Sequence, residues 1–303
     1  MLNIGEARET RERFGIKMIV DFASVPPSPD LDRQPNEHMK NYDRIYASGL
    51  SRTGKEGVAA KDGLKEYLAM YDRLGVDHVV IRAKDSESTV GIKVPYEDVA
   101  DFCRTHGPRF VALIGVDPHR GMDAVREFEF AVREMGFRGL QVSGFEARLP
   151  INSKLYYPLY AKAVELGVPV CIHSGMNFSS TSWMGFGRPI DLDEVLVHFP
   201  EMKAVASVPG FPWVQELVGV AWRHKNLWIA TSALRPKYLN TPGSGFETLL
   251  QYGRTILKDQ IIFGSNWPIL EVDRSIEEIR SLPISEDVQR KWLGENAMRL
   301  LGL

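Results

Sequence analysis

Cysteine is nearly absent from this sequence of 303 residues, which contains only Cys103 and Cys171. The two lie far apart in apolar surroundings, a pattern typical of buried thiols rather than of a disulfide framework. The sequence also lacks an excess of one charge, because 37 Lys and Arg balance 39 Asp and Glu to a formal net charge of -2. Without a strong positive field, we expect no binding to nucleic acid or to an anionic membrane surface.

Long apolar runs are missing as well. The first twenty residues mix charged with apolar side chains and therefore lack the apolar core of a signal peptide. No stretch is long enough to span a bilayer. Glycine-rich phosphate loops and a Gly-x-Ser-x-Gly elbow are also absent, which argues against nucleotide binding and serine-hydrolase chemistry. We therefore expect a cytoplasmic protein whose partners are small molecules or proteins.

What the sequence does contain is a regular alternation of short apolar runs with longer stretches of helical spacing. The runs are 18–23, 78–81, 110–116, 139–142, 168–173, 204–207, 227–230 and 261–263. They are rich in Val and Ile and almost free of charge, as buried parallel strands are. Alternation of this kind predicts parallel β/α units. Eight such strands favour an α/β fold, a single distorted (β/α)₈ TIM barrel that occupies residues 1–303 as one domain.

Three segments stand apart from this alternation. Residues 26–57 are rich in proline and charge, and we expect a long insertion after the first strand that serves as a lid or a subunit contact. Residues 177–188 follow the fifth strand and are expected to line the pocket, where Trp183 could wall a flat ligand. Residues 284–303 are expected to form a C-terminal helix that is N-capped by Ser285 and covers the barrel.

Several phrases occur together in the order and spacing of a known family. They are Gly136-Phe137-Arg138-Gly139-Leu140, the run from Leu166 to His173, Gly210-Phe211-Pro212-Trp213, Phe263-Gly264-Ser265-Asn266-Trp267-Pro268 and Asn296-Ala297-Met298-Arg299-Leu300-Leu301. On these phrases the chain, from about residue 17 onward, resembles the amidohydrolase superfamily. It is most similar to the amidohydrolase 2 branch, which includes decarboxylases and hydrolases of carboxylated rings and lactones. The resemblance implies a ligand pocket at the C-terminal ends of the strands.

The resemblance also implies a metal site, but most of its ligands are replaced in this sequence. The two histidines that end the first strand in the family correspond to Ala23 and Val25. The strand-six histidine corresponds to Ser207 and the strand-eight aspartate to Asn266, while the strand-five histidine is retained as His173. A catalytic zinc site needs about three protein ligands. We therefore expect a pocket without a metal and without another cofactor, unless a metal binds through other residues.

The residues at these positions are the candidates for chemistry. His173 is expected to be a general acid or base at the barrel mouth, the alternative being a neutral histidine bonded in the core. Asp21, retained from the family pattern, is expected to orient His173 or to bond backbone amides. Asn266 is expected to take part in catalysis, and Ser207 and Trp267 to contact substrate. Alternatively, these side chains fill the space that the metal left.

Basic residues follow two other strands. Arg82 follows the second strand and Arg235 the seventh, and either could bind a substrate carboxylate through its guanidinium. For Lys84 and Lys237 surface ion pairs are more typical. Glu146, which follows the fourth strand, could supply a replacement carboxylate, but a side chain that faces solvent is the favoured interpretation.

These features favour an enzyme, specifically an amidohydrolase-like hydrolase that works without a metal on a small carboxylated or cyclic compound such as a lactone. One alternative is a noncatalytic ligand-binding protein or partner subunit derived from an amidohydrolase. A further alternative is a non-oxidative decarboxylase, a lyase. By analogy with relatives we expect a homo-oligomer such as a dimer, the alternative being an assembly with a paralogous subunit.

Overall fold

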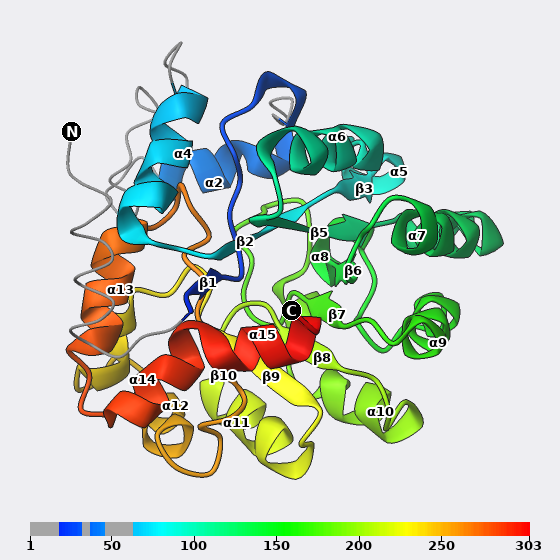
Figure 1. The fold of residues 1–303 in the computed structure, drawn as a ribbon. Helices are drawn as coiled ribbons and strands as arrows, with labels where there is room; N and C mark the ends of the chain where they lie inside the picture. The colour runs from blue at the N-terminus through cyan, green and yellow to red at the C-terminus, as the bar shows by residue number, and fades with distance from the viewer. Residues whose placement is uncertain (1–17, 32–36, 46–62) are drawn as a thin grey trace.

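The computed structural model describes residues 18–31, 37–45 and 63–303 of the chain (Figure 1). One parallel sheet of eight strands forms its centre, in the order β1-β2-β5-β6-β7-β8-β9-β10. The strands are β1 (Val20–Asp21), β2 (His78–Arg82), β5 (Phe110–Gly115), β6 (Leu140–Val142), β7 (Val170–Ile172), β8 (Ala204–Ala206), β9 (Leu227–Ala230) and β10 (Ile261–Ile262). Each predicted run overlaps one of these strands, so the predicted α/β fold with eight parallel strands is confirmed.

The sheet curls until its two edge strands meet. Phe22 at the end of β1 donates its backbone N–H to the carbonyl of Phe263 after β10, at 2.9 Å. An isolated parallel bridge joins Ser24 to Trp267 a little further along. Helices cover the outside of this barrel (Figure 1). They include α4 (Gly63–Leu74), α6 (Tyr96–His106), α7 (Met122–Glu134), α9 (Tyr157–Leu166), α10 (Asp191–His198), α11 (Val214–Arg223), α12 (Glu247–Gly253) and α13 (Val272–Arg280).

Alternate strand residues fill the barrel interior, because successive side chains of a strand point to opposite faces. Val20, Val80 and Cys171 belong to one buried cluster of this kind. Leu300 and Leu301 from the C-terminal helical segment join that cluster. This segment lies across the near end of the barrel in Figure 1, and it closes the end at which the strands begin. Among the described residues, this segment blocks one end of the barrel, and the other end is the one at which the strands finish.

The C-terminal helix begins as predicted but is not uniform. The hydroxyl of Ser285 accepts the backbone N–H of Val288 at 3.4 Å, which confirms the N-cap. The segment then runs through α14 (Glu286–Arg290), the π-helical turn η7 (Lys291–Glu295) and α15 (Asn296–Leu301). Among the described residues, no helix combines the length and the apolar character needed to cross a membrane.

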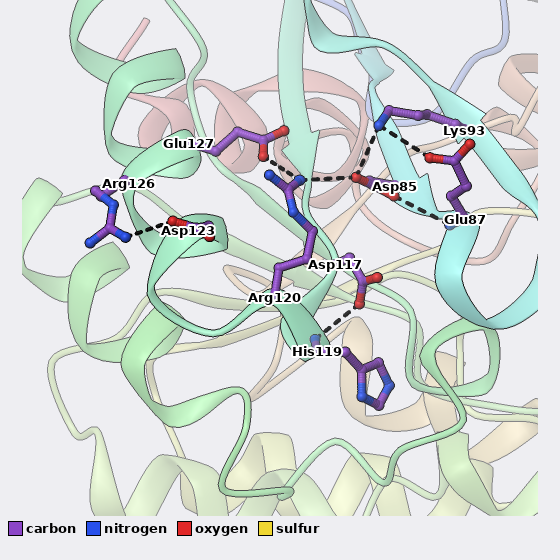
Figure 2. A network of polar contacts seen from close by, with 9 residues as sticks. All are labelled: Asp85, Glu87, Lys93, Asp117, His119, Arg120, Asp123, Arg126 and Glu127. Carbon is purple, nitrogen blue, oxygen red and sulfur yellow. Dashed lines mark hydrogen bonds and ion pairs between the residues drawn. The ribbon is translucent and has the colours of Figure 1, made fainter.

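An unpredicted hairpin follows β2. Its strands β3 (Lys84–Ser86) and β4 (Ile92–Val94) pair antiparallel around α5 (Glu87–Val90). Ion pairs stabilise this hairpin (Figure 2). Asp85 Oδ2 lies 3.2 Å from Arg120 Nη1 and 3.5 Å from Lys93 Nζ. Arg120 belongs to the short helix η4 (Pro118–Arg120) after β5, so the hairpin is tied to the rim of the next strand. No sequence pattern predicted this hairpin, because its strands are only three residues long.

Of the predicted insertion at residues 26–57, the structure describes only parts. These are η1 (Pro29–Leu31), η2 (Glu37–Met39) and α2 (Lys40–Ile45). The remainder, residues 32–36 and 46–57, lies outside the described residues. Asn41 of α2 donates to the carbonyl of Phe178 at 2.7 Å, so this part of the insertion contacts the loop after β7.

Candidate functional site

His173 stands at the C-terminal mouth of the barrel, directly after β7. Its backbone N–H donates to the carbonyl of Val142 on β6 at 2.9 Å, which extends the sheet by one residue. It lies two residues beyond Cys171, a member of the inner cluster, so strand alternation turns its ring into the barrel. The ring packs edge-on against Phe145 with centroids 4.6 Å apart. The side chain is partly exposed, but its Nδ1 is buried without a partner among the described residues.

The environment of His173 disfavours its charged form. Burial lowers the pKa of the imidazole to about 4, and although Glu146 acts to raise the pKa, the positive charges of Lys84 and Arg82 lower it further. At neutral pH the ring is therefore uncharged and can accept a proton. An uncharged ring is compatible with both predicted roles, a general base and a neutral histidine of the core, so the role of His173 stays a prediction. Three charged residues, Glu146, Lys84 and Arg82, act on the ring.

Arg82 reaches across the barrel interior. It follows Val80 of the inner cluster by two residues, and its Nη2 donates to the carbonyl of Phe22 at 3.2 Å and to Cys171 Sγ at 3.7 Å. Two strands, β5 and β6, separate β2 from β7 in the sheet. The guanidinium therefore crosses the barrel interior to reach Cys171 on β7. Its buried Nε has no partner among the described residues, and no carboxylate there forms an ion pair with it. Arg82 is a fixed cation with donor capacity to spare.

Lys84 and Glu146 form a buried ion pair beside His173. Lys84 Nζ lies 2.6 Å from Glu146 Oε1, and the two side chains are 14% and 2% exposed. The expectation of a solvent-facing Glu146 is therefore wrong, and the ion pair of Lys84 is interior rather than superficial. The reason is tertiary: α8 (Gly144–Ala147) turns back over the mouth immediately after β6, and the β3 hairpin carries Lys84 against it.

Gln141 is a further polar residue that the sequence reasoning missed. It occupies the centre of β6, is 8% exposed, and donates its Nε2 to the carbonyl of Val142 at 3.2 Å. A polar residue inside an otherwise apolar buried strand was a usable signal, because such a group needs a partner in the core.

Ser207 and Asn266 occupy the other side of the mouth. Ser207 follows β8, is 5% exposed, and donates its N–H to the carbonyl of Ile172 at 2.7 Å. Its hydroxyl hydrogen-bonds the buried thiol of Cys171, whose pKa burial raises. Asn266 has a left-handed backbone, with φ 55°, and donates its N–H to the carbonyl of Ala23 at 2.8 Å. Both lie at former ligand positions, and their contact with substrate stays a prediction.

Asp21 is not brought to His173. It is fully buried, and its carboxylate accepts Tyr71 Oη at 2.8 Å, Ser265 Oγ at 2.6 Å, Ser265 N at 2.7 Å and Ala23 N at 3.3 Å. Tyr71 belongs to α4, so the carboxylate faces the outer helix layer and the seam between β1 and β10. Burial raises the pKa of Asp21, and these hydrogen bonds oppose the rise. Of its two predicted roles, the geometry matches bonding to backbone amides.

The remaining candidates also have their contacts elsewhere. Arg235 forms an ion pair with Glu278 of α13. Trp183 is 77% exposed and stacks on Phe186 of the same loop. Trp267 is 8% exposed and packs against Tyr67 of α4, with ring centroids 4.8 Å apart. The structure thus places Arg82, His173 and Ser207 near Cys171. Arg235, Trp183 and Trp267 have their contacts elsewhere.

Comparison with known proteins places the chain among amidohydrolases. The sequence profile of the amidohydrolase family matches residues 50–303. A gamma-resorcylate decarboxylase from Polaromonas sp. is 26% identical over 235 residues, which cover 64% of this chain and 70% of that protein. A second gamma-resorcylate decarboxylase, from Rhizobium radiobacter, is 25% identical over 256 residues, 72% of this chain and 78% of that one.

A solved structure gives the same fold. An uncharacterised TIM-barrel protein from Bordetella bronchiseptica superimposes with a TM-score of 0.77 at 25% identity, over 94% of this chain and 98% of the other. The likeness to this barrel and the relatives above agree with the fold that the strand order describes.

The donor set at the mouth does not suit a divalent metal. Within the described ranges, no group of three or more His, Cys, Asp or Glu side chains is placed to hold one. The residues that follow β8 and β10, Ser207 and Asn266, carry neutral oxygens, which are weak substitutes for imidazole and carboxylate as metal ligands. The guanidinium of Arg82 adds a positive charge that opposes a second cation nearby. No chemical step is therefore derived through a metal.

Proposed function

Because the chain belongs to the amidohydrolase family, we propose that it is an enzyme that binds a small aromatic carboxylate at the barrel mouth and releases the carboxyl group as carbon dioxide. Arg82 carries this proposal. Arg82 is partly buried, and among the described residues its guanidinium bonds a carbonyl and a thiol but no carboxylate, so it is available to pair with a substrate anion. A carboxylate suits its planar fork. The named relatives are decarboxylases, which supports this alternative over the hydrolysis that the sequence favoured.

The uncharged imidazole of His173 supports a proton-transfer route for a phenolic acid. In this route Arg82 holds the substrate carboxylate, and His173 accepts the phenolic proton, which makes the ring electron-rich. The imidazolium then donates that proton to the ring carbon bearing the carboxylate. The bond from that carbon to the carboxylate breaks, its electron pair returns to the ring, and carbon dioxide leaves. The phenolate product takes a proton from water, so the reaction consumes one proton overall.

The same neutral imidazole favours a second candidate, hydrolysis of a lactone. His173 would accept a proton from water, and the hydroxide would attack the carbonyl carbon while Arg82 stabilises the oxyanion. The ring C–O bond then breaks, and the leaving oxygen takes the proton back from the imidazolium. The products are a hydroxyl group and a carboxylate, with no carbon dioxide. Release of carbon dioxide therefore separates the two candidates.

The test uses purified protein with γ-resorcylate, the acid named in the Polaromonas relative, and with dihydrocoumarin as a lactone. Carbon dioxide and ring absorbance are followed with EDTA and, separately, with added Mn²⁺. We expect carbon dioxide release from the phenolic acid in EDTA. Arg82→Gln should reduce kcat/KM about 100-fold, because it removes a charge-assisted hydrogen bond to the carboxylate. The control Arg223→Gln, in an exposed pair with Asp193, should retain full activity.

Three results would contradict the proposal in different ways. Turnover that requires Mn²⁺ would show that a metal supplies the cation. Ring opening of the lactone without any decarboxylation would select the second candidate. Saturable binding of the phenolic acid that depends on Arg82, without turnover of either compound, would indicate a noncatalytic ligand-binding protein or subunit.

A further inference from the structure

A small cavity lies beside the Lys84–Glu146 pair, on the side away from the β1–β10 seam. Its volume is about 20 Å³. The lining comes from the β3 hairpin, the ends of β5 and β6, the turn α8 and the residue before α9. Its polar members are Lys84, Asp85, Ser86, Gln141, Ser143, Glu146 and Tyr156.

Two deeply buried atoms of this lining have no hydrogen-bond partner among the described residues. They are Tyr156 Oη, in a side chain 2% exposed, and Gln141 Oε1, in a side chain 8% exposed. Because Gln141 Nε2 already donates to the carbonyl of Val142, the amide oxygen is left facing elsewhere as an acceptor. A hydroxyl that can donate and an amide oxygen that can accept therefore line one cavity. Leaving both unsatisfied would cost folding free energy.

The charges of the lining decide what class of ligand fits. The ammonium of Lys84 opposes a cation, and the carboxylates of Glu146 and Asp85 oppose an anion. Asp85 is also neutralised from outside by Arg120 and Lys93 (Figure 2). The ligand must therefore be neutral and able both to accept and to donate. A buried water needs roughly 10–15 Å³ and two to four polar partners, and this cavity meets both conditions.

We infer that the cavity is a resident water site in which Tyr156 and Gln141 hold a water molecule against the Lys84–Glu146 pair. The water accepts a hydrogen bond from the Tyr156 hydroxyl and donates one to Gln141 Oε1. Its second O–H and second lone pair are then available to Glu146 and Lys84. Tyr156 and Gln141 are then positioning residues, because they fix Lys84 and Glu146, two of the three charged groups that act on His173. This positioning role rests on the proposed function, whereas the water site does not.

The first test is a high-resolution crystal structure of the full chain. We expect density for a water within hydrogen-bond distance of both Tyr156 Oη and Gln141 Oε1. A cavity without such density would overturn the inference.

The second test compares two tyrosines in denaturant unfolding. Tyr156→Phe should raise the unfolding equilibrium constant about fivefold to tenfold, because it removes a hydroxyl that is bonded to water. Tyr160→Phe is the matched control, since its buried hydroxyl donates directly to the carbonyl of Ile151 at 2.7 Å. Equal or greater stability of Tyr156→Phe, set against a loss in Tyr160→Phe, would show that the cavity is dry. Gln141→Met repeats the test from the acceptor side.

The positioning role is read from the ring of His173 by NMR titration, which requires no substrate. The charged groups that act on this ring are Glu146, Lys84 and Arg82. Tyr156→Phe should shift the midpoint of the His173 titration, whereas Tyr160→Phe should leave it in place. Bound water with an unmoved midpoint in Tyr156→Phe would refute the positioning role. Failure to find decarboxylation would leave both readouts intact, so the two proposals fail separately.

Discussion

The two sides of the barrel mouth carry opposite kinds of side chain. On the side formed by β8 and β10, Ser207 and Asn266 present neutral oxygens at positions where the family binds a metal. On the side formed by β2, β6 and the hairpin, Arg82, Lys84 and Glu146 bring three charges into partly or fully buried positions. The two sides therefore differ in what they can offer a ligand, with neutral hydrogen-bonding groups on one side and charged groups on the other.

The charged side should be the more sensitive to substitution, and Glu146→Gln should give the largest effect. The change leaves the buried ammonium of Lys84 without the carboxylate that lies 2.6 Å from it. Breaking a buried pair by removing one partner costs about 3–5 kcal/mol of unfolding free energy. The control Asp123→Asn breaks an exposed pair with Arg126, seen in Figure 2, and should cost less than about 0.5 kcal/mol. Equal losses of unfolding free energy in Glu146→Gln and Asp123→Asn, measured by urea denaturation, would contradict the expected difference between a buried and an exposed ion pair.

His173 provides the next effect, through pH. Its folded pKa of about 4 lies below the ordinary value of 6.5, so the unfolded chain binds a proton more readily between these values. Unfolding free energy should therefore fall as pH drops from 6.5 to 4, by up to roughly 3 kcal/mol from this residue. In His173→Asn that contribution disappears and the pH profile flattens over this window.

The comparison with the wild type isolates His173 from other titrations. Asp21 has the opposite tendency, because its raised pKa makes stability fall as pH rises from 3.8 toward its folded value. That contribution is common to both proteins and cancels. His198→Asn, at an exposed position on α10, calibrates the loss of a surface imidazole. A wild-type profile that runs parallel to that of His173→Asn between pH 4 and 6.5 would contradict a depressed pKa.

The neutral side should give the smallest effect. Asn266→Asp restores the carboxylate of the family pattern, but it provides only a second ligand beside His173, fewer than the three that a catalytic site uses. We expect no rise in melting temperature with millimolar Mn²⁺ in the variant or in the wild type. A saturable rise in the variant alone would show that this side still has metal-site geometry and lacks only one ligand.

The local pattern of the sequence was enough to predict the barrel and the location of its mouth. Strand runs are recognisable because a strand buried on both faces must be apolar along its whole length. The cap at Ser285 and the position of His173 at the end of a strand follow from equally local rules. The replacement of metal ligands, inferred from the surrounding phrases, stays a prediction.

The partners of the polar residues could not be predicted in the same way. The face to which Asp21 turns depends on the packing of Tyr71 and Ser265, which are distant in sequence. Whether Glu146 meets solvent depends on the hairpin after β2, whose short strands leave little trace in the sequence. Arg235 follows a strand as Arg82 does, yet it pairs with Glu278 of α13.

The sequence by itself determined the α/β barrel and the position of His173 at the end of a strand. Only the tertiary structure decided that Arg82 reaches Phe22 and Cys171 and that Lys84 and Glu146 form a buried pair. The physical reason is the distance along the sequence over which each effect acts. Apolar periodicity acts between neighbours along one strand or helix, whereas the energy of a buried charge depends on every group that the fold brings around it.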